Sequence, residues 1–533
     1  MLRAAPGDLK GLFLNTIHFV STDEPQPSRT PQRARLRHSL LRLLLLLLFC
    51  TILAPHAAHA QNIEARISLS DTTTPRVRVE GTRREATRVW SFLNIYASAT
   101  NLAERIENLS LADAEGVEVA ARKLAPGEYE AARPATRFSY DFKLNPPEFL
   151  SDSAHVSWLT PDRALIMPAD LLPIHTGEAK LSLVLPAGWT LASAETRTSD
   201  GAYRLADAST AVFFAGKNLT ERRMRAGSME VSLTLAGTWP FDEAEFERTA
   251  SAILGDYRKM TGGVPRSRAL VILTPFPRPA PATNWSAETR GGTVVLLSGV
   301  SPSKVAALAQ INSTLAHELL HLWVPNGLGL EGEYAWFYEG FTLYQALRLG
   351  VRRGDLTFQD YLNALARSYD AYKSVRGGDT HSLVEASTRR WTGAPSLVYQ
   401  KGLLVAFLYD LTLRQKTNHK KSLDDVYREL FRRRATSRPR ADGSATVIDA
   451  LKSVGEMETF TRLYIENPVA IDLEASIAPF GLRVEAFGTR TRLSVSPNLA
   501  RRQRDLLRDL GYNEEANAAT RRLHESLKKR QHK

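Results

Sequence analysis

Short runs in which apolar and polar residues alternate occupy the chain from about residue 61 to residue 240. Two examples are 138–144 and 179–185, and Gly, Pro, Asp and Asn residues separate such runs. A period of two indicates strands with one buried face. We therefore predict a β-sandwich-like N-terminal domain at 61–240. Because it contains no motif for chemistry, we interpret it as a structural or substrate-shaping module.

Helical spacing replaces this alternation after Pro240 and continues to about Tyr464. Inside this stretch, 269–274 and 293–298 have the composition of two strands joined by a proline-rich loop. These features predict a second, mainly helical domain at 241–484.

The last residues, 485–533, predict a short tail that is basic and mostly helical. Ser496-Pro497 is a good helix start, and Gly511 is a helix stop. The leucines between them fall on one face of such a helix. The predicted fold class is therefore multidomain α+β, with a β-sandwich-like domain, a mainly helical domain and a helical tail.

The first sixty residues have the pattern of an export signal. Several arginines lead into the apolar run 43–54, and Ala58-His59-Ala60 follows it. Cleavage there would leave Gln61 first, so we expect an exported protein, periplasmic or secreted. The run is shorter than the about twenty residues of a membrane span, which makes an uncleaved membrane anchor the weaker alternative. The polar stretch before Arg33 is long for a signal and suggests a start codon further downstream.

Cysteine usage restricts the chemistry of any site. The chain has one cysteine, Cys50, and it lies inside the apolar run of the signal. The mature protein would then contain none, which excludes disulfides, cysteine nucleophiles and thiolate metal sites. Any metal must be held by His, Asp or Glu.

Positive charge is concentrated towards the C-terminus. The net charge is +12, and 432–440 and 501–533 are rich in arginine and lysine. Such runs can contact an anionic envelope surface, although a solvated helix face is the simpler interpretation. Apart from Tyr512, no aromatic residue is interleaved with them for stacking on bases, so we expect no nucleic-acid partner.

The strongest chemical signal is His-Glu-Leu-Leu-His at 317–321, inside a predicted helix from about Pro302 to Trp323. Residues four apart lie on one helical face, so His317 and His321 can offer ring nitrogens to one ion. Glu318 then lies beside them and is predicted to act as general base on a water molecule. Zinc suits this set, because it lowers the pKa of a bound water to near neutrality.

A third ligand is predicted from Trp336-Phe-Tyr-Glu339-Gly-Phe, which follows on a second predicted helix. Glu339 lies among aromatic residues, where an unpaired buried carboxylate would cost several kcal/mol. A metal or a basic residue is the natural partner. The competing interpretation is an exposed glutamate at a helix start.

His-Glu-x-x-His followed by Trp-x-x-Glu-Gly-Phe resembles the gluzincin metallopeptidases, and more narrowly the M61 glycyl aminopeptidase family; M1 aminopeptidases are more distant. Ser382 to Ser387, Tyr399-Gln-Lys-Gly402 and Ser422 to Asp425 resemble further M61 motifs in the same order. The resemblance implies a thermolysin-like fold for 241–484, one zinc ion per chain, peptide or protein substrates, and Tyr399 as the catalytic tyrosine. An oxyanion needs a donor opposite the metal, which a phenol can provide. Without the resemblance, Tyr399 would be interpreted as a core tyrosine.

Two departures from the M61 pattern affect the prediction. The Asn that follows the family's Trp is replaced by Val324. The segment whose glutamate is expected to bind a free amino terminus is represented only by Gly291-Gly292, with Glu288 nearby as a candidate for that role. We therefore predict an aminopeptidase-like zinc peptidase and keep two alternatives, an endopeptidase of the same fold and a non-hydrolytic zinc-containing binding or scaffold protein of the cell envelope.

Overall fold

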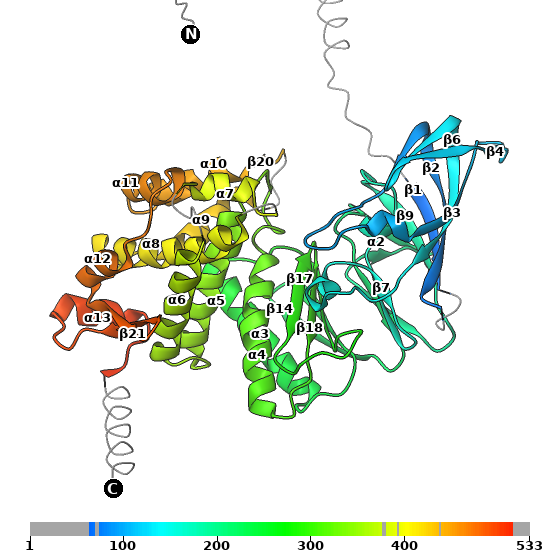
Figure 1. The fold of residues 1–533 in the computed structure, drawn as a ribbon. Coiled ribbons are helices and arrows are strands. Elements are labelled where there is room, and N and C mark those ends of the chain that lie inside the picture. The colour runs from blue at the N-terminus through cyan, green and yellow to red at the C-terminus, as the bar shows by residue number, and fades with distance from the viewer. Residues whose placement is uncertain (1–62, 70–73, 376–379, 392–393, 436–438, 515–533) are drawn as a thin grey trace, which may run out of the picture. The chain divides into compact units, whose positions relative to one another are not determined.

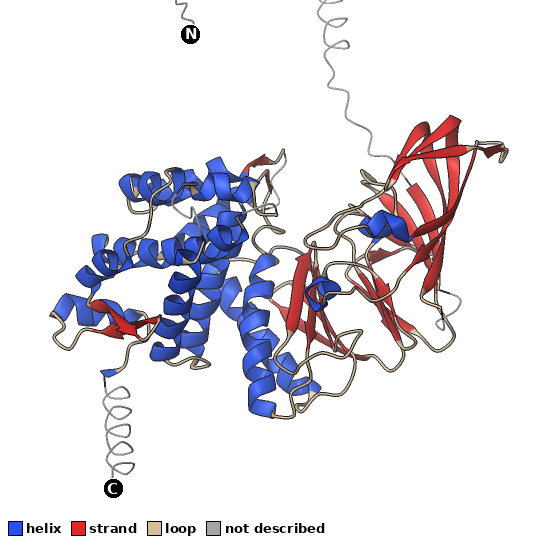
Figure 2. Ribbon diagram, viewed as in Figure 1, coloured by secondary structure: helices blue, strands red, loops and turns tan. Residues whose placement is uncertain are grey.

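The computed structural model describes residues 63–69, 74–375, 380–391, 394–435 and 439–514. The expected export signal at 1–60 and the end of the basic tail lie outside these residues. Within the described part, β-sheets precede a helical region, as predicted for the α+β class (Figures 1 and 2). None of the helices described there combines the length and the apolar character that crossing a membrane requires.

Two sheets form the N-terminal β-rich region. Among the described residues, the first sheet has nine strands in the order β11-β12-β9-β1-β2-β6-β3-β4, with β5 paired to β6, and the second has the order β10-β13-β8-β7. Apolar residues of both sheets, such as Ile67, Tyr140 and Phe213, share one buried core. Two sheets around one core agree with the predicted β-sandwich-like domain.

The strands of these two sheets are β1 (Ile63–Ser68), β2 (Arg76–Ser91), β3 (Ile106–Ala112), β4 (Glu118–Val119), β5 (Ala121–Ala125), β6 (Glu128–Lys143), β7 (Trp158–Leu159), β8 (Arg163–Ile166), β9 (Ala179–Val184), β10 (Thr190–Ser193), β11 (Thr196–Arg197), β12 (Tyr203–Leu205) and β13 (Phe213–Gly216). Short helices between them are η1 (Leu102–Arg105), η2 (Leu150–Ala154) and α2 (Pro168–Leu171).

A third sheet packs against the helical region. Its strands come from both sides of the predicted domain boundary at residue 240. Its order is β14-β15-β16-β18-β17, from β14 (Thr220–Ala226), β15 (Met229–Leu235), β16 (Arg268–Thr274), β17 (Trp285–Arg290) and β18 (Thr293–Ser298). β15 pairs in parallel with β16 across an intervening helix, a long-range pairing that local alternation does not reveal. β17 is antiparallel to β18, lies at the sheet edge, and was not predicted.

Helices of the second region pack on this sheet in one apolar core. They are α3 (Glu243–Thr261), α4 (Lys304–His321), η3 (Trp336–Phe341), α5 (Thr342–Arg353), α6 (Phe358–Lys373), α7 (Leu383–Thr388), η4 (Leu397–Lys401), α8 (Gly402–Lys416), α9 (Leu423–Arg434), α10 (Gly443–Ser453), α11 (Glu458–Thr461), η5 (Arg462–Glu466), α12 (Leu473–Ile477), η6 (Ala478–Phe480) and α13 (Arg501–Asp509). A short pair, β19 (Leu330–Glu331) and β20 (Ala441–Asp442), lies among them.

The described part of the tail is less helical than predicted. β21 (Leu482–Phe487) and β22 (Arg490–Val495) form an antiparallel hairpin, and the helix α13 follows it. Gly488 has φ +61° and makes the tight turn between the two strands. The Thr491 N–H donates to Asp370 Oδ2 of α6 at 2.9 Å. The hairpin is therefore held by its own turn and by a contact with the helical region.

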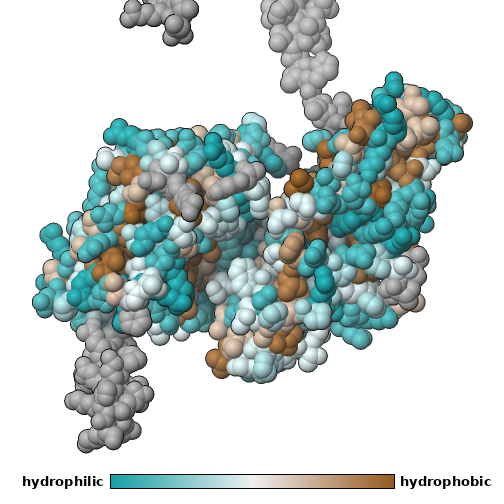
Figure 3. Space-filling view, viewed as in Figure 1, coloured by the Kyte–Doolittle hydropathy of each residue, from teal (hydrophilic) through white to brown (hydrophobic). Residues whose placement is uncertain are grey.

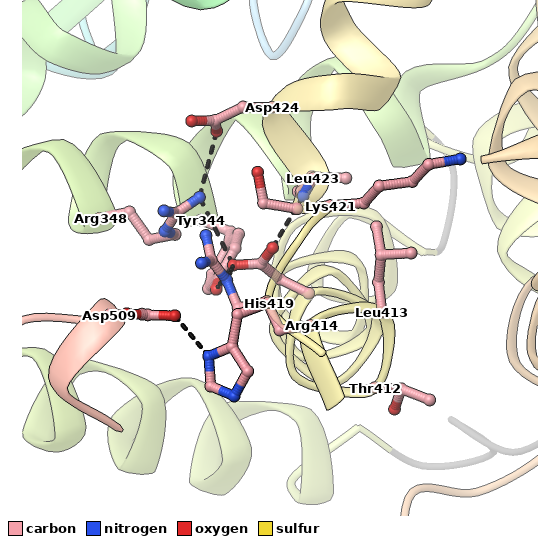
Figure 4. Close-up of polar contacts among 12 residues, drawn as sticks. Tyr344, Arg348, Thr412, Leu413, Arg414, His419, Lys421, Leu423, Asp424 and Asp509 are labelled. Carbon is pink, nitrogen blue, oxygen red and sulfur yellow. Dashed lines mark hydrogen bonds and ion pairs between the residues drawn. The ribbon is translucent and has the colours of Figure 1, made fainter. Parts of the chain in front are cut away.

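Buried charges join three helices within the second region. Asp410 of α8 is fully buried and contacts Arg348 of α5 at 3.4 Å and Arg414 at 3.1 Å. It also accepts hydrogen bonds from Tyr344 Oη at 2.8 Å and from the Leu423 N–H of α9 at 2.7 Å. The labelled partners converge from the three helices in Figure 4. This cluster fixes α5, which continues directly from η3.

Apolar residues on the face shown in Figure 3 are scattered among hydrophilic ones and do not gather in one broad patch. Scattered single apolar residues are normal on a folded surface.

Candidate active site

Helix α4 places the two histidines side by side. Ser303 caps its N-terminus by accepting a hydrogen bond from the Ala306 N–H, and Leu315 and Leu319 face the core. His317 and His321 project from the other side with their Nε2 atoms 3.0 Å apart. The predicted helix and the i, i+4 arrangement are confirmed.

Glu339 completes a group that could hold a metal ion. Its Oε2 lies 3.4 Å from His317 Nε2 and 3.6 Å from His321 Nε2. Among the described residues these three ligands lie within 4.8 Å of one another. Ligands at zinc distances in a tetrahedron lie about 3.3 Å apart, so the three atoms fit three corners of a zinc site and leave the fourth open.

Local electrostatics agree with a cation site. Burial alone would raise the pKa of Glu339, but His317, His321 and Arg390 hold that pKa well below its ordinary value. The His321 Nδ1 lies 2.9 Å from the Val324 carbonyl oxygen, a contact that favours Nδ1–H and leaves Nε2 free for a metal. The Val324 backbone carbonyl therefore orients this histidine.

Glu318 lies next to the metal ligands and is held by a residue that the sequence did not single out. Thr289 Oγ1 of β17 donates to Glu318 Oε2 at 2.7 Å and also contacts the Glu318 carbonyl oxygen at 2.9 Å. Glu318 is 5% exposed and lines the same cavity as His317, His321 and Glu339. The edge strand β17 therefore orients the predicted general base.

Tyr399 comes from η4 and lines the same cavity, which has a volume of about 910 Å³. Burial and the nearby Glu339 raise the pKa of Tyr399 above its ordinary value, against the effect of Arg390. At neutral pH the phenol therefore keeps its proton and can donate a hydrogen bond. Both η3 and η4 are π-helical turns, which often occur at functional sites.

Two glycines bring Glu339 and Tyr399 together. A Cβ on Gly340 would lie 2.6 Å from the Gly402 Cα, and a Cβ on Gly402 would lie 2.9 Å from the Trp336 carbonyl oxygen. Both distances are too short for a side chain. Backbone therefore packs on backbone where η3 meets η4 and α8.

Comparison with known proteins agrees with a metallopeptidase-like site. Residues 330–405 match the family model described as M61 glycyl aminopeptidase. This segment is therefore similar to the M61 family. The matched segment includes Glu339 and Tyr399, while the two histidines lie just before it. A search of curated protein sequences found no match.

Several solved structures share the fold of this chain. An aminopeptidase N family protein from Idiomarina loihiensis has a TM-score of 0.67 and 19% identity, with 79% of each chain covered. The M1 zinc metallopeptidase from Deinococcus radiodurans has a TM-score of 0.52 and 16% identity, and covers 78% of this chain and 95% of its own. A mutant of that enzyme, bound to a Tyr-Ser-Ala substrate, has a TM-score of 0.51 and 15% identity over the same shares. The fold is thus that of the M1 metallopeptidases.

The predicted substrate-binding residues separate into two groups in the structure. Glu288 on β17 lines the cavity. Gly291 and Gly292 form the turn between β17 and β18, and neither is among the described residues that line the cavity. Gly291 has φ +51°, a conformation that favours glycine and fits the tight turn.

Glu288 is already surrounded by hydrogen-bond donors. Its carboxylate contacts Arg290 Nε at 2.8 Å and His155 Nδ1 at 2.7 Å, and it accepts from the Tyr96 hydroxyl. Burial alone would raise its pKa, but Arg290 and His155 lower it to about 2. Glu288 is therefore ionised and partly neutralised. His155 and Tyr96 belong to the β-rich region, so both regions line the cavity.

The residues that sequence reasoning missed are Thr289, Arg390 and Ser387. Arg390 contacts both Glu339 and Tyr399. Ser387, at the end of the Ser382–Ser387 motif, accepts the Trp336 N–H at 2.9 Å and ties α7 to η3. Only Ser387 lay in a motif that the sequence analysis identified, and no periodic pattern marks the other two.

Proposed function

We propose that this chain is a zinc-dependent peptidase that hydrolyses peptide bonds, with aminopeptidase-like action and one zinc ion per chain. The supporting observation is that three ligand atoms with zinc-like spacing, the Glu318 carboxylate and the Tyr399 phenol line one cavity. Neutral imidazole and carboxylate ligands with one open position are the set that catalytic zinc uses. The match to a peptidase family model supports peptide or protein substrates.

Each side chain has a role in this proposal. Zinc bound to His317, His321 and Glu339 would supply a Lewis acid that polarises a peptide carbonyl and makes water acidic. Glu318, oriented by Thr289, takes a proton from the attacking water and passes it to the leaving amine. Tyr399 donates its O–H to the oxyanion that forms at the carbonyl.

The environment of Glu288 affects whether the enzyme cleaves at the N-terminus or inside a peptide. A buried carboxylate at one side of the cavity suits capture of a free amino terminus, which favours an aminopeptidase. Its contacts with Arg290 and His155 reduce the charge available to an ammonium group, which favours the alternative of an endopeptidase. The two actions differ in their need for a free N-terminus.

The test is digestion of a mixed peptide library, half of it N-acetylated, by the purified chain with zinc content measured alongside. Glu318→Gln is expected to keep zinc and to lower kcat about 10²–10⁴-fold, because proton transfer is lost. Glu331→Gln, an exposed glutamate outside the cavity lining, is the control and should keep wild-type activity. If single residues are removed, and only from peptides with a free N-terminus, an aminopeptidase is supported. Internal cuts in N-acetylated peptides support an endopeptidase.

Other results would reject the peptidase proposal. Zinc binding with no cleavage by the wild-type chain would favour the non-hydrolytic binding protein of the cell envelope. A chain that binds no metal would remove the basis of the proposal.

We also propose that the protein acts outside the cytoplasm. The charge and hydropathy pattern of residues 33–60 supports this proposal. N-terminal sequencing of the protein from its native host should find Gln61 first. A chain that retains the segment 43–54 in the membrane fraction would favour the anchored alternative.

A further inference from the structure

Arg390 lies beside the candidate metal site and takes no part in the proton transfers and metal binding proposed above. It follows α7, and its side chain is 14% exposed. Its Nη2 contacts Glu339 Oε1 at 2.6 Å and Tyr399 Oη at 2.8 Å, and its Nη1 contacts Tyr338 Oη at 3.0 Å. The guanidinium thus joins a predicted metal ligand to the predicted oxyanion donor.

The contact with Glu339 divides the roles of its two oxygens. Oε1 accepts the hydrogen bond from Arg390, while Oε2 faces the Nε2 atoms of His317 and His321. A charge-assisted hydrogen bond is among the strongest in proteins, so Oε1 is held away from the histidines. One oxygen remains for a metal, which keeps the carboxylate monodentate and the fourth position free.

The contact with Tyr399 determines where the phenol can donate. Arginine has only donors, so Tyr399 Oη must accept from Nη2. The phenol hydrogen therefore points away from Arg390. Since Tyr399 lines the cavity, this hydrogen is free to donate there, where an oxyanion would need a donor.

Arg390 itself is fixed by its surroundings. Its guanidinium lies 4.3 Å from the Trp391 ring centroid and 5.6 Å from that of Tyr338, both within cation–π range. Both terminal nitrogens already contact protein groups, which argues against capture of a substrate carboxylate. Lysine could not reproduce this geometry, because its single nitrogen lacks the planar fork.

We propose that Arg390 is a positioning residue that keeps Glu339 monodentate and directs the Tyr399 O–H into the cavity. This rests on the proposed peptidase function for its effect on rate. The effect on Glu339 does not depend on turnover and can be measured separately.

The test uses Arg390→Met in the full chain, with Arg389→Met as the matched control. Arg389 is the neighbouring arginine, is exposed, and contacts His381 outside the cavity lining. Arg390→Met is expected to lower kcat about 10²-fold, as when one oxyanion donor is lost, with KM changed by less than roughly threefold. Arg389→Met should match the wild type in both constants. Circular dichroism of each variant checks that it folds.

A double-variant cycle shows whether Arg390 acts through Tyr399. Tyr399→Phe alone should lower kcat by a similar factor, and Arg390→Met added to it should lower kcat by less than roughly threefold more. Fully multiplied losses would overturn the Tyr399 half of the proposal. So would a raised KM with unchanged kcat, which would make Arg390 a substrate contact.

Cobalt substitution tests the Glu339 half without turnover. If Arg390 keeps Glu339 monodentate, Arg390→Met should lower the visible absorption of bound Co²⁺, because a second carboxylate oxygen raises the coordination number. Unchanged spectra would overturn this half. Arg390→Lys should recover less than about one tenth of the lost kcat, and full recovery would mean that charge alone matters. A wild-type chain that binds cobalt normally but cleaves no peptide would reject the peptidase function and leave the spectral test valid.

Discussion

Replacement of Asp410 by asparagine is expected to destabilise the protein strongly although the site lies outside the cavity. Asp410 is fully buried, and its carboxylate is shared by Arg348, Arg414, Tyr344 and the backbone of Leu423. Burial alone would raise its pKa, but Arg348 and Arg414 keep that pKa below the ordinary value. Asparagine has a similar shape but no charge, and its amide nitrogen cannot accept the hydrogen bonds that one carboxylate oxygen accepts now.

The expected magnitude follows from what each arginine loses. Removing one partner of a buried ion pair costs about 3–5 kcal/mol, because the other charge is left uncompensated. Arg414 loses its ionic partner, whereas Arg348 keeps Asp424 at 3.1 Å. We therefore expect the lower end, about 3 kcal/mol of the free energy of unfolding. This is a large share of the roughly 5–15 kcal/mol that stabilises a typical protein.

Urea denaturation followed by tryptophan fluorescence, at one fixed zinc concentration, measures this loss. Glu230→Gln is the control, because its pair with Arg225 is exposed and should contribute less than about 1 kcal/mol. The double variant Asp410→Asn/Arg414→Met should be more stable than Asp410→Asn, since it also removes the orphaned charge. A loss for Asp410→Asn no larger than that of the control would refute the reasoning.

Two further predictions concern the site. Gly402→Ala should lower kcat without changing a metal ligand, because its Cβ would lie 2.9 Å from the Trp336 carbonyl and push Tyr399 away from Glu339; steady-state kinetics measure this, and wild-type kcat would contradict it. Glu288 has a pKa of about 2, below its ordinary 4.5, so it stabilises the folded state above pH 4.5 and this stabilisation is lost as the pH falls towards 2. The difference in unfolding free energy between the wild type and Glu288→Gln should shrink over that range, and a constant difference would exclude the ion pair with Arg290 as its source.

The metal group could be predicted because its signals are local. His317 and His321 are four residues apart on one helix, and the aromatic neighbours of Glu339 indicated a buried carboxylate that needs a partner. The β-rich region was predictable for the same reason, since alternation repeats every two residues. Tyr399 depended on resemblance, because one tyrosine before an apolar helix has no pattern of its own.

The remaining parts depend on contacts between distant segments. Thr289 reaches Glu318 only because β17 pairs at the sheet edge beside α4, and Arg390 reaches Glu339 only after η3 and α7 have packed. β15 pairs in parallel with β16 across α3. The third sheet therefore begins before residue 240, the predicted domain boundary. In the tail, a glycine turn forms a hairpin over 482–495, before the helix that the leucine spacing predicted after Ser496 and that is present as α13.

The contact between Gly340 and Gly402 links two motifs that look independent in the sequence. Glu339 precedes one glycine and Tyr399 stands three residues before the other, so the spacing of ligand and phenol is set by how closely two backbones approach. Substitution of either glycine by a larger residue would impair the enzyme even if His-Glu-x-x-His and Glu339 were intact. In distant sequences, the two glycines together would therefore distinguish working peptidases from inactive descendants that still bind metal.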